Sequence, residues 1–359
     1  MKKNDFKVLR QNVGIDLSKD DFKADITVLT ENLECRTITQ KKFNNSPSGI
    51  TEFLKWSDSN KANSSMELGY TMEATGIYHE NLAYALFEKE KAVHVVLPNL
   101  AKKFAESIGY KSKTDKLDAK SLGRMGVERI LTRWKPCSKN IKVLKNLTRE
   151  RAMRQKEKTK AKNQLHALRY SNSPNQSTLE RYDSLISFLE DQVKVIEKEI
   201  NELIQSDQVL SKKVEKITST PGLGLITVAS VIAETNGFAS ITNIKQLQSY
   251  AGYDIRIRES GKWKGRSKIS KKGNSYIRHA LYFPSYTIIK YSKYHKSFYD
   301  RLVEKKGKSL IASTAIQRKL LGLIYTLWKN DTYFDPNYSQ KKQDIHRELH
   351  EPVSSFGLL

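Results

Sequence analysis

Apolar and polar side chains alternate through the first forty residues of the chain, which is the pattern of β-strands. Val13, Ile15 and Leu17 share one face of the first run, and smaller or polar residues fall between them. Two further runs, at 22–29 and 34–40, follow after short polar turns. Short turns between strands of this kind predict an antiparallel meander.

The pattern then changes to alternating helix and strand. Helix-period stretches at 49–57 and 78–90 are separated by predicted strands at 68–76 and 92–98, and a basic helix begins near Lys111. Three antiparallel strands followed by helix and strand in alternation is the order of an RNase H-like sheet. Other α/β domains share parts of this order, so the order alone does not decide the fold.

The middle of the chain has the seven-residue repeat of packed helices. The apolar positions alternate in spacings of 3 and 4 and are Ile186, Leu189, Val193, Ile196, Ile200 and Leu203. The preceding helical stretch, 144–168, carries Arg151, Arg154 and Lys158 on one stripe, and a polar loop at 170–178 separates the two. We expect an antiparallel coiled-coil hairpin. It could be a structural arm, an arm that dimerises, or one that lies on nucleic acid.

A Pro-Gly-Leu-Gly turn at 221–224 opens the apolar helix of the C-terminal region. Gly222 and Gly224 let the backbone approach a ligand closely, and the free N–H groups of a helix N-terminus can bind a phosphate. The turn resembles a helix-hairpin-helix DNA contact, although a plain turn between two helices has the same composition.

The composition of the chain indicates that it binds nucleic acid. Lys and Arg number 63 against 39 Asp and Glu, a formal net charge of +24. Such an excess is relieved most naturally by phosphates. The longest apolar stretch, 223–233, is shorter than the ~20 residues of a membrane span, and the N-terminus lacks the apolar core of a secretion signal. Cys35 and Cys137 have neither disulfide nor zinc spacing, so we expect a cytoplasmic protein.

The chain thus divides into four predicted regions, which together make an α/β part followed by a mostly α part. They are an RNase H-like domain at 1–135, a coiled-coil hairpin at 136–211, a C-terminal DNA-binding domain at 212–335 and a polar tail at 336–359.

Two carboxylates stand out in the basic helix. Asp115 and Asp118 are three residues apart and would share a helix face. At ~4–5 Å two such charges repel by roughly 3–4 kcal/mol, which a bound divalent cation would reverse. Two more acids, Asp16 and Glu73, end the first and fourth strands, which are neighbours in an RNase H-like sheet. Small residues beside Asp16, such as Gly14, would leave room for an ion or a phosphate.

Four hard oxygen ligands suit Mg²⁺ or Mn²⁺ rather than zinc. Two such ions ~3.5–4 Å apart could activate a nucleophile and stabilise the leaving oxygen of a phosphodiester. Each acid alone is more ordinary as a surface or capping residue. The hypothesis depends on all four acids falling where one fold would bring them together.

The stretch 253–278 has nine Lys or Arg and two acids, and its pattern predicts a basic β-hairpin followed by a turn into a helix. Ser260 precedes Gly261, so its hydroxyl would be open to a bulky substrate; Ser267, Ser270 and Ser275 are alternatives. Basic side chains around it would hold phosphates. The predicted nucleic-acid contacts of the whole chain are Lys111, Lys113, Arg151, Arg154, Lys158, Gly222, Gly224, Arg256, Arg258, Lys264, Arg266, Lys268, Lys271 and Lys272.

Five stretches of this sequence resemble the DEDD transposases of the insertion-sequence-110 family, which are related to the pilin-gene invertases. They run in family order and are VGIDLSKDDFKADI, MEATGIYHENLAYAL, KTDKLDAKSLGRM, STPGLGLITVASVIAE and YAGYDIRIRESGKWKGRSKISKKGNSYIRHALY. The resemblance implies that Asp16, Glu73, Asp115 and Asp118 are RuvC-like metal-binding acids and that Ser260 is a nucleophile. It also implies a DNA recombinase guided by a structured RNA from the element's own non-coding ends.

Two other functions stay open on the residues themselves. A metal-dependent nuclease or junction resolvase would use the four acids and leave Ser260 as a surface residue. A non-catalytic nucleic-acid-binding protein would need neither. Salt dependence of binding would be steep for all three, so it cannot separate them. We expect a homodimer or homotetramer.

Overall fold

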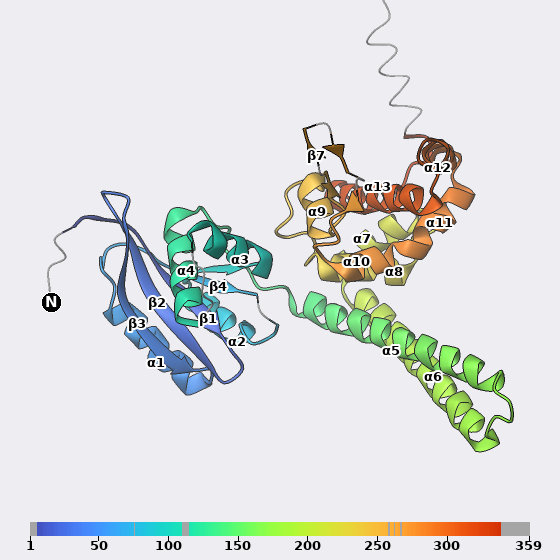
Figure 1. Cartoon of the computed structure of the whole chain (residues 1–359), viewed down its shortest axis with the longest axis horizontal. Helices are drawn as coiled ribbons and strands as arrows, with labels where there is room; N and C mark the ends of the chain where they lie inside the picture. Colours follow the sequence, from blue (N-terminus) through green and yellow to red (C-terminus); the bar gives the residue numbers. More distant parts are fainter. Residues whose placement is uncertain are drawn as a thin grey trace, which may run out of the picture. The chain divides into compact units, whose positions relative to one another are not determined.

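The computed structural model describes residues 6–74, 76–109, 115–257, 259–261, 263–265 and 268–338, with only the backbone described at 115, 116 and 264. The chain forms two compact units that divide after Pro136 (Figure 1). No helix of the described part is long and apolar enough to cross a membrane.

The first unit is built on a mixed five-stranded sheet in the order β3-β2-β1-β4-β5. β1, β2 and β3 are antiparallel to one another, whereas β4 lies parallel to β1, and β5 parallel to β4. The strands are β1 (Val8–Leu17), β2 (Asp21–Thr30), β3 (Cys35–Asn44), β4 (Leu68–Glu73) and β5 (Ala92–Val96). The predicted meander, the two later strands and the pairing of the first strand with the fourth are all confirmed.

One face of this sheet carries the apolar core. The alternation that predicted β1 places Val13 and Ile15 here, fully buried. Helices α1 (Pro47–Ser59) and α2 (Glu80–Glu88) pack their apolar stripes against it. Phe53 of α1 sits at the centre of an aromatic cluster, with ring centroids between 5.2 and 6.2 Å from those of its neighbours. Because this face is apolar throughout, the polar positions of β1 must turn to the other face.

The other face is lined by small and polar residues and is covered by helix α4 (Asp115–Glu128). Its neighbour, α3 (Pro98–Ser107), was not predicted; it packs through Phe104 in a small core that also contains Leu122 and Met125 of α4. Pro98 at the first helical position begins α3 where the sequence pattern indicated only the end of a strand.

The second unit begins with two long helices, α5 (Lys139–Arg169) and α6 (Gln176–Ser206), joined by a short loop, so that they form an antiparallel hairpin, here called the arm (Figure 1). The predicted seven-residue repeat is buried along α6 from Ile186 to Ile200, and Ile204 rather than Leu203 completes it. Leu144 at the base of α5 belongs to the core of the C-terminal helices, so the base of the arm and those helices pack as one.

The rest of the second unit is mostly helical, as predicted. Apolar α8 and α13 are its most buried helices. The helices are α7 (Gln208–Thr218), α8 (Leu225–Glu234), α9 (Ile244–Tyr250), α10 (Ser275–Ala280), α11 (Tyr282–Tyr291), α12 (Lys293–Lys306) and α13 (Ser309–Asn330).

A β-ribbon lies between α9 and α10, where the basic hairpin was predicted. Its base pairs β6 (Ile255–Arg256) with β9 (Lys268–Ile269), and its outer part pairs β7 (Glu259–Ser260) with β8 (Trp263–Lys264). The predicted Gly-Asn turn follows, and the side chain of Asn274 caps α10 by accepting hydrogen bonds from the N–H groups of Tyr276 and Ile277.

Candidate catalytic and nucleic-acid sites

Asp16 and Glu73 lie at the same end of two adjacent parallel strands. The last paired residues of β1 and β4 are Ile15 and Met72, and Asp16 and Glu73 come next on each strand. Both are half-buried. Residues alternate in side along a strand, so Asp16 shares a side with Gly14, the side that α4 covers.

Helix α4 makes backbone contact with β1. A Cβ on Gly14 would come within 2.0 Å of both the carbonyl oxygen of Ala119 and the backbone nitrogen of Gly123, and one on Gly126 would come within 2.2 Å of the Asn12 side chain. The helix therefore runs antiparallel to the strand.

The position of the first turn of α4 follows from these contacts. Two residues of β1 span about 6.8 Å, which corresponds to between four and five residues of helix at about 1.5 Å each. Two residues further along β1, from Gly14 to Asp16, the facing part of α4 is therefore one turn earlier. That turn contains Asp115 and Asp118. The backbone brings this turn over the end of β1. Asp118 is half-buried, and the side chain of Asp115 lies outside the described residues.

Gly14 has a different role from the one predicted. The space beside it is filled by the backbone of α4, so it leaves no room there for an ion or a phosphate. The helix approaches closely because glycines face each other from strand and helix, Gly14 from β1 and Gly123 from α4. The glycine thus sets the distance between the acid-bearing helix and the acid-bearing strand.

The four predicted acids are the candidate ligands for a metal ion. Among the described side chains, no group of three His, Cys, Asp or Glu residues is close enough to hold a metal ion, but this set does not include Asp115. The available donors are carboxylate oxygens, the type that Mg²⁺ and Mn²⁺ prefer. The donor chemistry therefore fits a divalent cation of that class.

A fifth carboxylate on this face was missed from the sequence. Asp25 of β2 pairs with Gly14 across the sheet and is fully buried. It accepts hydrogen bonds from the side chains of Thr27, Gln40 and Thr37, the last at 3.2 Å. A Cβ on Gly123 would lie 3.2 Å from its Oδ1, so Asp25 forms part of the seat of α4. Asp25 falls among the polar residues that alternate with apolar ones along β2, so its burial had no local signal.

Ser260 is exposed near the tip of the ribbon, directly opposite Trp263. Gly261 follows it with φ of +55°, in the left-handed region that glycine adopts readily. Of the basic residues expected around it, Arg256, Lys268, Lys271 and Lys272 are exposed. The remaining predicted residues lie outside the part of the chain that the structure describes; they are Lys111, Lys113, Arg258, Arg266, the alternative Ser267 and the side chain of Lys264.

The predicted basic stripe of α5 faces acids. Arg151 Nε donates to Glu197 of α6 at 2.6 Å, and Lys158 Nζ lies 3.9 Å from Glu190 of the same helix. Arg154 pairs within α5, with Glu157 at 3.0 Å. These three cations are half-buried and already paired, whereas other basic residues of α5 are exposed.

The two glycines of the turn before α8 differ in surroundings. Gly222 has φ of +88°, and a Cβ there would lie 3.1 Å from Thr287 of α11, so it shapes the turn against that helix. Gly224, the N-cap of α8, is exposed, and a Cβ added there would have no neighbouring atom within 4 Å. Only Gly224 has the open surroundings that a phosphate contact at this helix N-terminus needs.

An ion pair at the base of the arm was also missed. Arg149 Nε and Nη2 donate to the two oxygens of Glu234 at 2.6 and 2.9 Å, and Asn274 Nδ2 donates to the same carboxylate at 2.6 Å. Burial alone would raise the pKa of Glu234, but the hydrogen bonds from Arg149 and Asn274 outweigh it and hold this pKa below its usual range. The network joins α5, the end of α8 and the start of α10.

Comparisons with known proteins match two regions of the chain. A family model described as "Transposase", of the DEDD IS110 type, matches residues 13–169, and one described as "Transposase IS116/IS110/IS902 family" matches residues 214–300. The chain is 28% identical over 327 residues to the pilin gene-inverting proteins of Moraxella lacunata and Moraxella bovis, covering 90% of this chain and 97% of each relative. A solved structure of T. thermophilus RuvC in complex with a Holliday junction substrate is 14% identical with a TM-score of 0.24, covering 32% of this chain and 90% of that one. The chain belongs to the IS110 family of transposases.

Proposed function

We propose that this IS110-family transposase cuts and rejoins DNA through a DEDD carboxylate site, Asp16, Glu73, Asp115 and Asp118, and a serine nucleophile, Ser260. The family implies DNA as the substrate and a divalent metal ion as the cofactor. The proposal adds the residues that carry each step and a transient covalent link between protein and DNA.

The observation that carries the proposal is the convergence of three acid-bearing segments. The ends of β1 and β4 are adjacent through their parallel pairing, and the close glycine contact of β1 with α4 brings the first turn of that helix over them. Three segments far apart in sequence each contribute acid to one end of one sheet, the arrangement expected of an RNase H-like nuclease. Chance surface acids have no reason to converge in this way.

The carboxylates would hold Mg²⁺ or Mn²⁺, which when bound would lower the pKa of an attacking hydroxyl and stabilise a leaving oxygen. Asp16 and Glu73 would be held by the ordered sheet, and Asp118 by the seating of α4. A carboxylate on a rigid element is positioned more accurately than one on a loop.

Ser260 would act as the nucleophile. Its Oγ would attack the phosphorus of a DNA phosphodiester, forming a Ser–O–P bond as the P–O bond to the departing strand breaks. The hydroxyl proton passes to a base and the departing oxygen is protonated. Attack by a strand's free hydroxyl on the same phosphorus would release Ser260 and join the new strand without ATP. Exposure of Ser260 on the ribbon and the exposed cations Arg256 and Lys268 support this role.

We further propose that a structured RNA guides the enzyme and that the working form is a homodimer or homotetramer. The resemblance to the family supports the RNA, and the net charge of +24 is suited to binding more than one polyanion. In an oligomer, Ser260 of one copy could meet the carboxylates of another.

The test is cleavage and joining of labelled DNA carrying an end of the element, with Mg²⁺ and RNA from its flanking non-coding region. We expect Asp16→Asn and Glu73→Gln to abolish both reactions, whereas Asp20→Asn, on the exposed turn after β1, retains them. Cleavage that survives Ser260→Ala would indicate a hydrolytic nuclease or resolvase. Binding with no cleavage by any variant would indicate a non-catalytic nucleic-acid-binding protein.

A further inference from the structure

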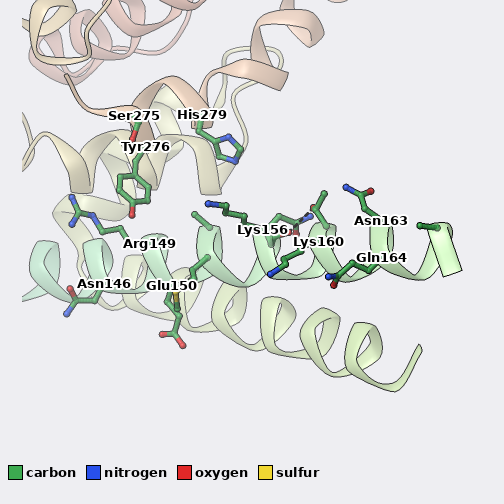
Figure 2. Close-up of a pocket in the computed structure, with 15 residues that line it drawn as sticks. Asn146, Arg149, Glu150, Lys156, Lys160, Asn163, Gln164, Ser275, Tyr276 and His279 are labelled. Atoms are coloured by element: carbon green, nitrogen blue, oxygen red, sulfur yellow. Dashed lines mark hydrogen bonds between the residues drawn. The ribbon is translucent and has the colours of Figure 1, made fainter. Parts of the chain in front are cut away.

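A long open groove runs along the arm where it meets α10. A cavity of about 1320 Å³ between α5 and α10 adjoins one of about 330 Å³ between α5, α8, α10 and the start of α11. The two share lining residues, among them Arg149, Gln155, Tyr276 and His279, so they form one continuous depression, here called the arm groove. Figure 2 shows Tyr276 and His279 on the α10 side of it and Arg149 and Lys156 on α5.

The α5 wall of the arm groove is a second basic stripe, distinct from the one that faces α6. Arg149, Met153, Lys156, Lys160 and Asn163 recur every three or four residues, which places them on one helix face. All five are exposed. Glu150 is the one acid of this wall, and it lies 3.8 Å from Arg154. The wall therefore offers Lys156 and Lys160 about one turn apart, with Arg149 about two turns before Lys156.

The opposite wall is aromatic. Tyr276, His279 and Phe283 line the groove from α10 and the start of α11. Tyr276 is 41% exposed and Phe283 is 72% exposed, so both rings are accessible to a ligand. Exposed rings beside cations are the recurring composition of surfaces on which unpaired bases stack.

A buried network fixes the junction between the two walls. The Arg149 guanidinium lies 4.8 Å from the centre of the Tyr276 ring and forms the two-pronged ion pair with Glu234. Glu234 is 1% exposed at its side chain, and Asn274, which caps α10, holds its second oxygen. The Tyr276 ring is thereby held in place before any ligand binds, which reduces the entropy lost on binding.

The far end of the groove is the first turn of α8. Ile226 and Thr227 line the smaller cavity, directly after the exposed N-cap Gly224. A strand lying on the aromatic wall would reach the free N–H groups of this helix with a phosphate.

We infer that the arm groove binds an unpaired nucleic-acid strand, with its phosphates along Lys156 and Lys160 and its bases on Tyr276 and Phe283. A duplex buries its base faces in its own stack and would leave these rings without a partner. A peptide would need an acidic chain to match the wall. The inference rests on the proposed function, since a recombinase must hold strands that have left a duplex.

The experiment measures binding of labelled single strands of roughly 15 nucleotides, as DNA and as RNA of the same sequence, with the DNA duplex as a third probe. The groove variant carries both Lys156→Gln and Lys160→Gln. The control variant carries Lys194→Gln and Lys198→Gln, which remove two exposed charges from the arm outside the groove. We expect the groove variant alone to reduce the salt dependence of single-strand binding by a slope of about 1.4.

The aromatic wall is tested by Phe283→Ala against Tyr291→Ala, a ring on the same helix that is 66% exposed and outside the groove. We expect Phe283→Ala to weaken single-strand binding about 5- to 150-fold, the effect of losing one stacked base. Phe283→Trp, which keeps a ring, should bind like the wild type. Because both rings are exposed, neither change should alter the melting temperature.

A loss confined to RNA assigns the groove to the guide, and a loss confined to DNA assigns it to the recombining strand; either supports the inference. Groove variants that match their controls, or that weaken duplex binding as much as single-strand binding, overturn it. The assay is run in chelator, so it measures binding in the absence of metal-dependent cleavage. Failure of the catalytic proposal therefore leaves this result readable.

Discussion

The contact between Gly14 and α4 makes a sharp prediction about stability and catalysis together. In Gly14→Ala, the new Cβ would lie 2.0 Å from backbone atoms of Ala119 and Gly123, whereas ordinary contacts begin near 3.4 Å. The atoms in the way belong to the helix backbone, so no side chain can rotate to relieve the clash. The helix must therefore move outward by about 1.4 Å, the difference between these two distances.

The size of the effect follows from that displacement. Overpacking of a rigid core costs typically 1–3 kcal/mol, and we expect about 3 kcal/mol here because backbone meets backbone. That cost corresponds to a fall of roughly 10 °C in the melting temperature of a unit of this size. Moving Asp118 by over an ångström relative to Asp16 should also reduce metal-dependent cleavage by about 100-fold at temperatures where the unit is folded.

Differential scanning calorimetry and cleavage of element-end DNA provide the two readouts. Gly126→Ala meets only the side chain of Asn12, and alanine favours a helix interior by up to about 1 kcal/mol, so we expect a smaller loss. Gly322→Ala, inside α13, would place its Cβ at an ordinary 3.5 Å from Ile244, so it should be nearly neutral in stability. A Gly14→Ala protein that melts and cleaves like the Gly322→Ala protein would refute the account of how α4 is seated.

Three further outcomes follow from buried titratable groups. Arg149→Gln leaves the Glu234 carboxylate buried without its cation and should lower the free energy of unfolding by about 2 kcal/mol at pH 7. Because Arg149 helps to hold the pKa of Glu234 low in the wild type, the difference between variant and wild type should shrink at pH 4. Urea unfolding at the two pH values measures this, and an equal difference at both would contradict it. Burial lowers the pKa of His295 to about 4, so stability should rise from pH 4 to 6.5, and His295→Asn should lose that rise in thermal melts. Burial and the carboxylate of Glu128 raise the pKa of Cys35 to about 11. In a Cys137→Ser background, alkylation of Cys35 should therefore be slow at pH 8 and should become faster when Glu128→Gln is added. An alkylation rate at pH 8 like that of a free thiol would contradict this.

The order of strands could be predicted because alternation and turn chemistry are local. The same local pattern placed Asp16 and Glu73 at strand ends, and the pairing of the first strand with the fourth followed from the order of elements. The use of Gly14 could not be predicted in this way. A glycine beside an acid suggests empty space, but here the space is filled by a helix more than a hundred residues later in the chain.

Contacts between residues far apart in sequence also explain why the predicted basic stripe of α5 is paired with acids. Helical spacing showed that Arg151 and Lys158 share a stripe, but only the structure shows that Glu197 and Glu190 face that stripe. Lys156 and Lys160 are exposed on a different face of α5, the one that lines the arm groove. Likewise, no local pattern connects Arg149 with a glutamate 85 positions away.

The most direct test of the central claim is to trap the covalent link between protein and DNA. The wild type is incubated with Mg²⁺, labelled element-end DNA and the flanking RNA, denatured, digested and examined by mass spectrometry. The account predicts a DNA adduct on the peptide that contains Ser260. It also predicts that the adduct is lost in Ser260→Ala and Asp118→Asn and retained in Ser270→Ala. Cleaved DNA without any adduct, or an adduct that persists in Ser260→Ala, would contradict it.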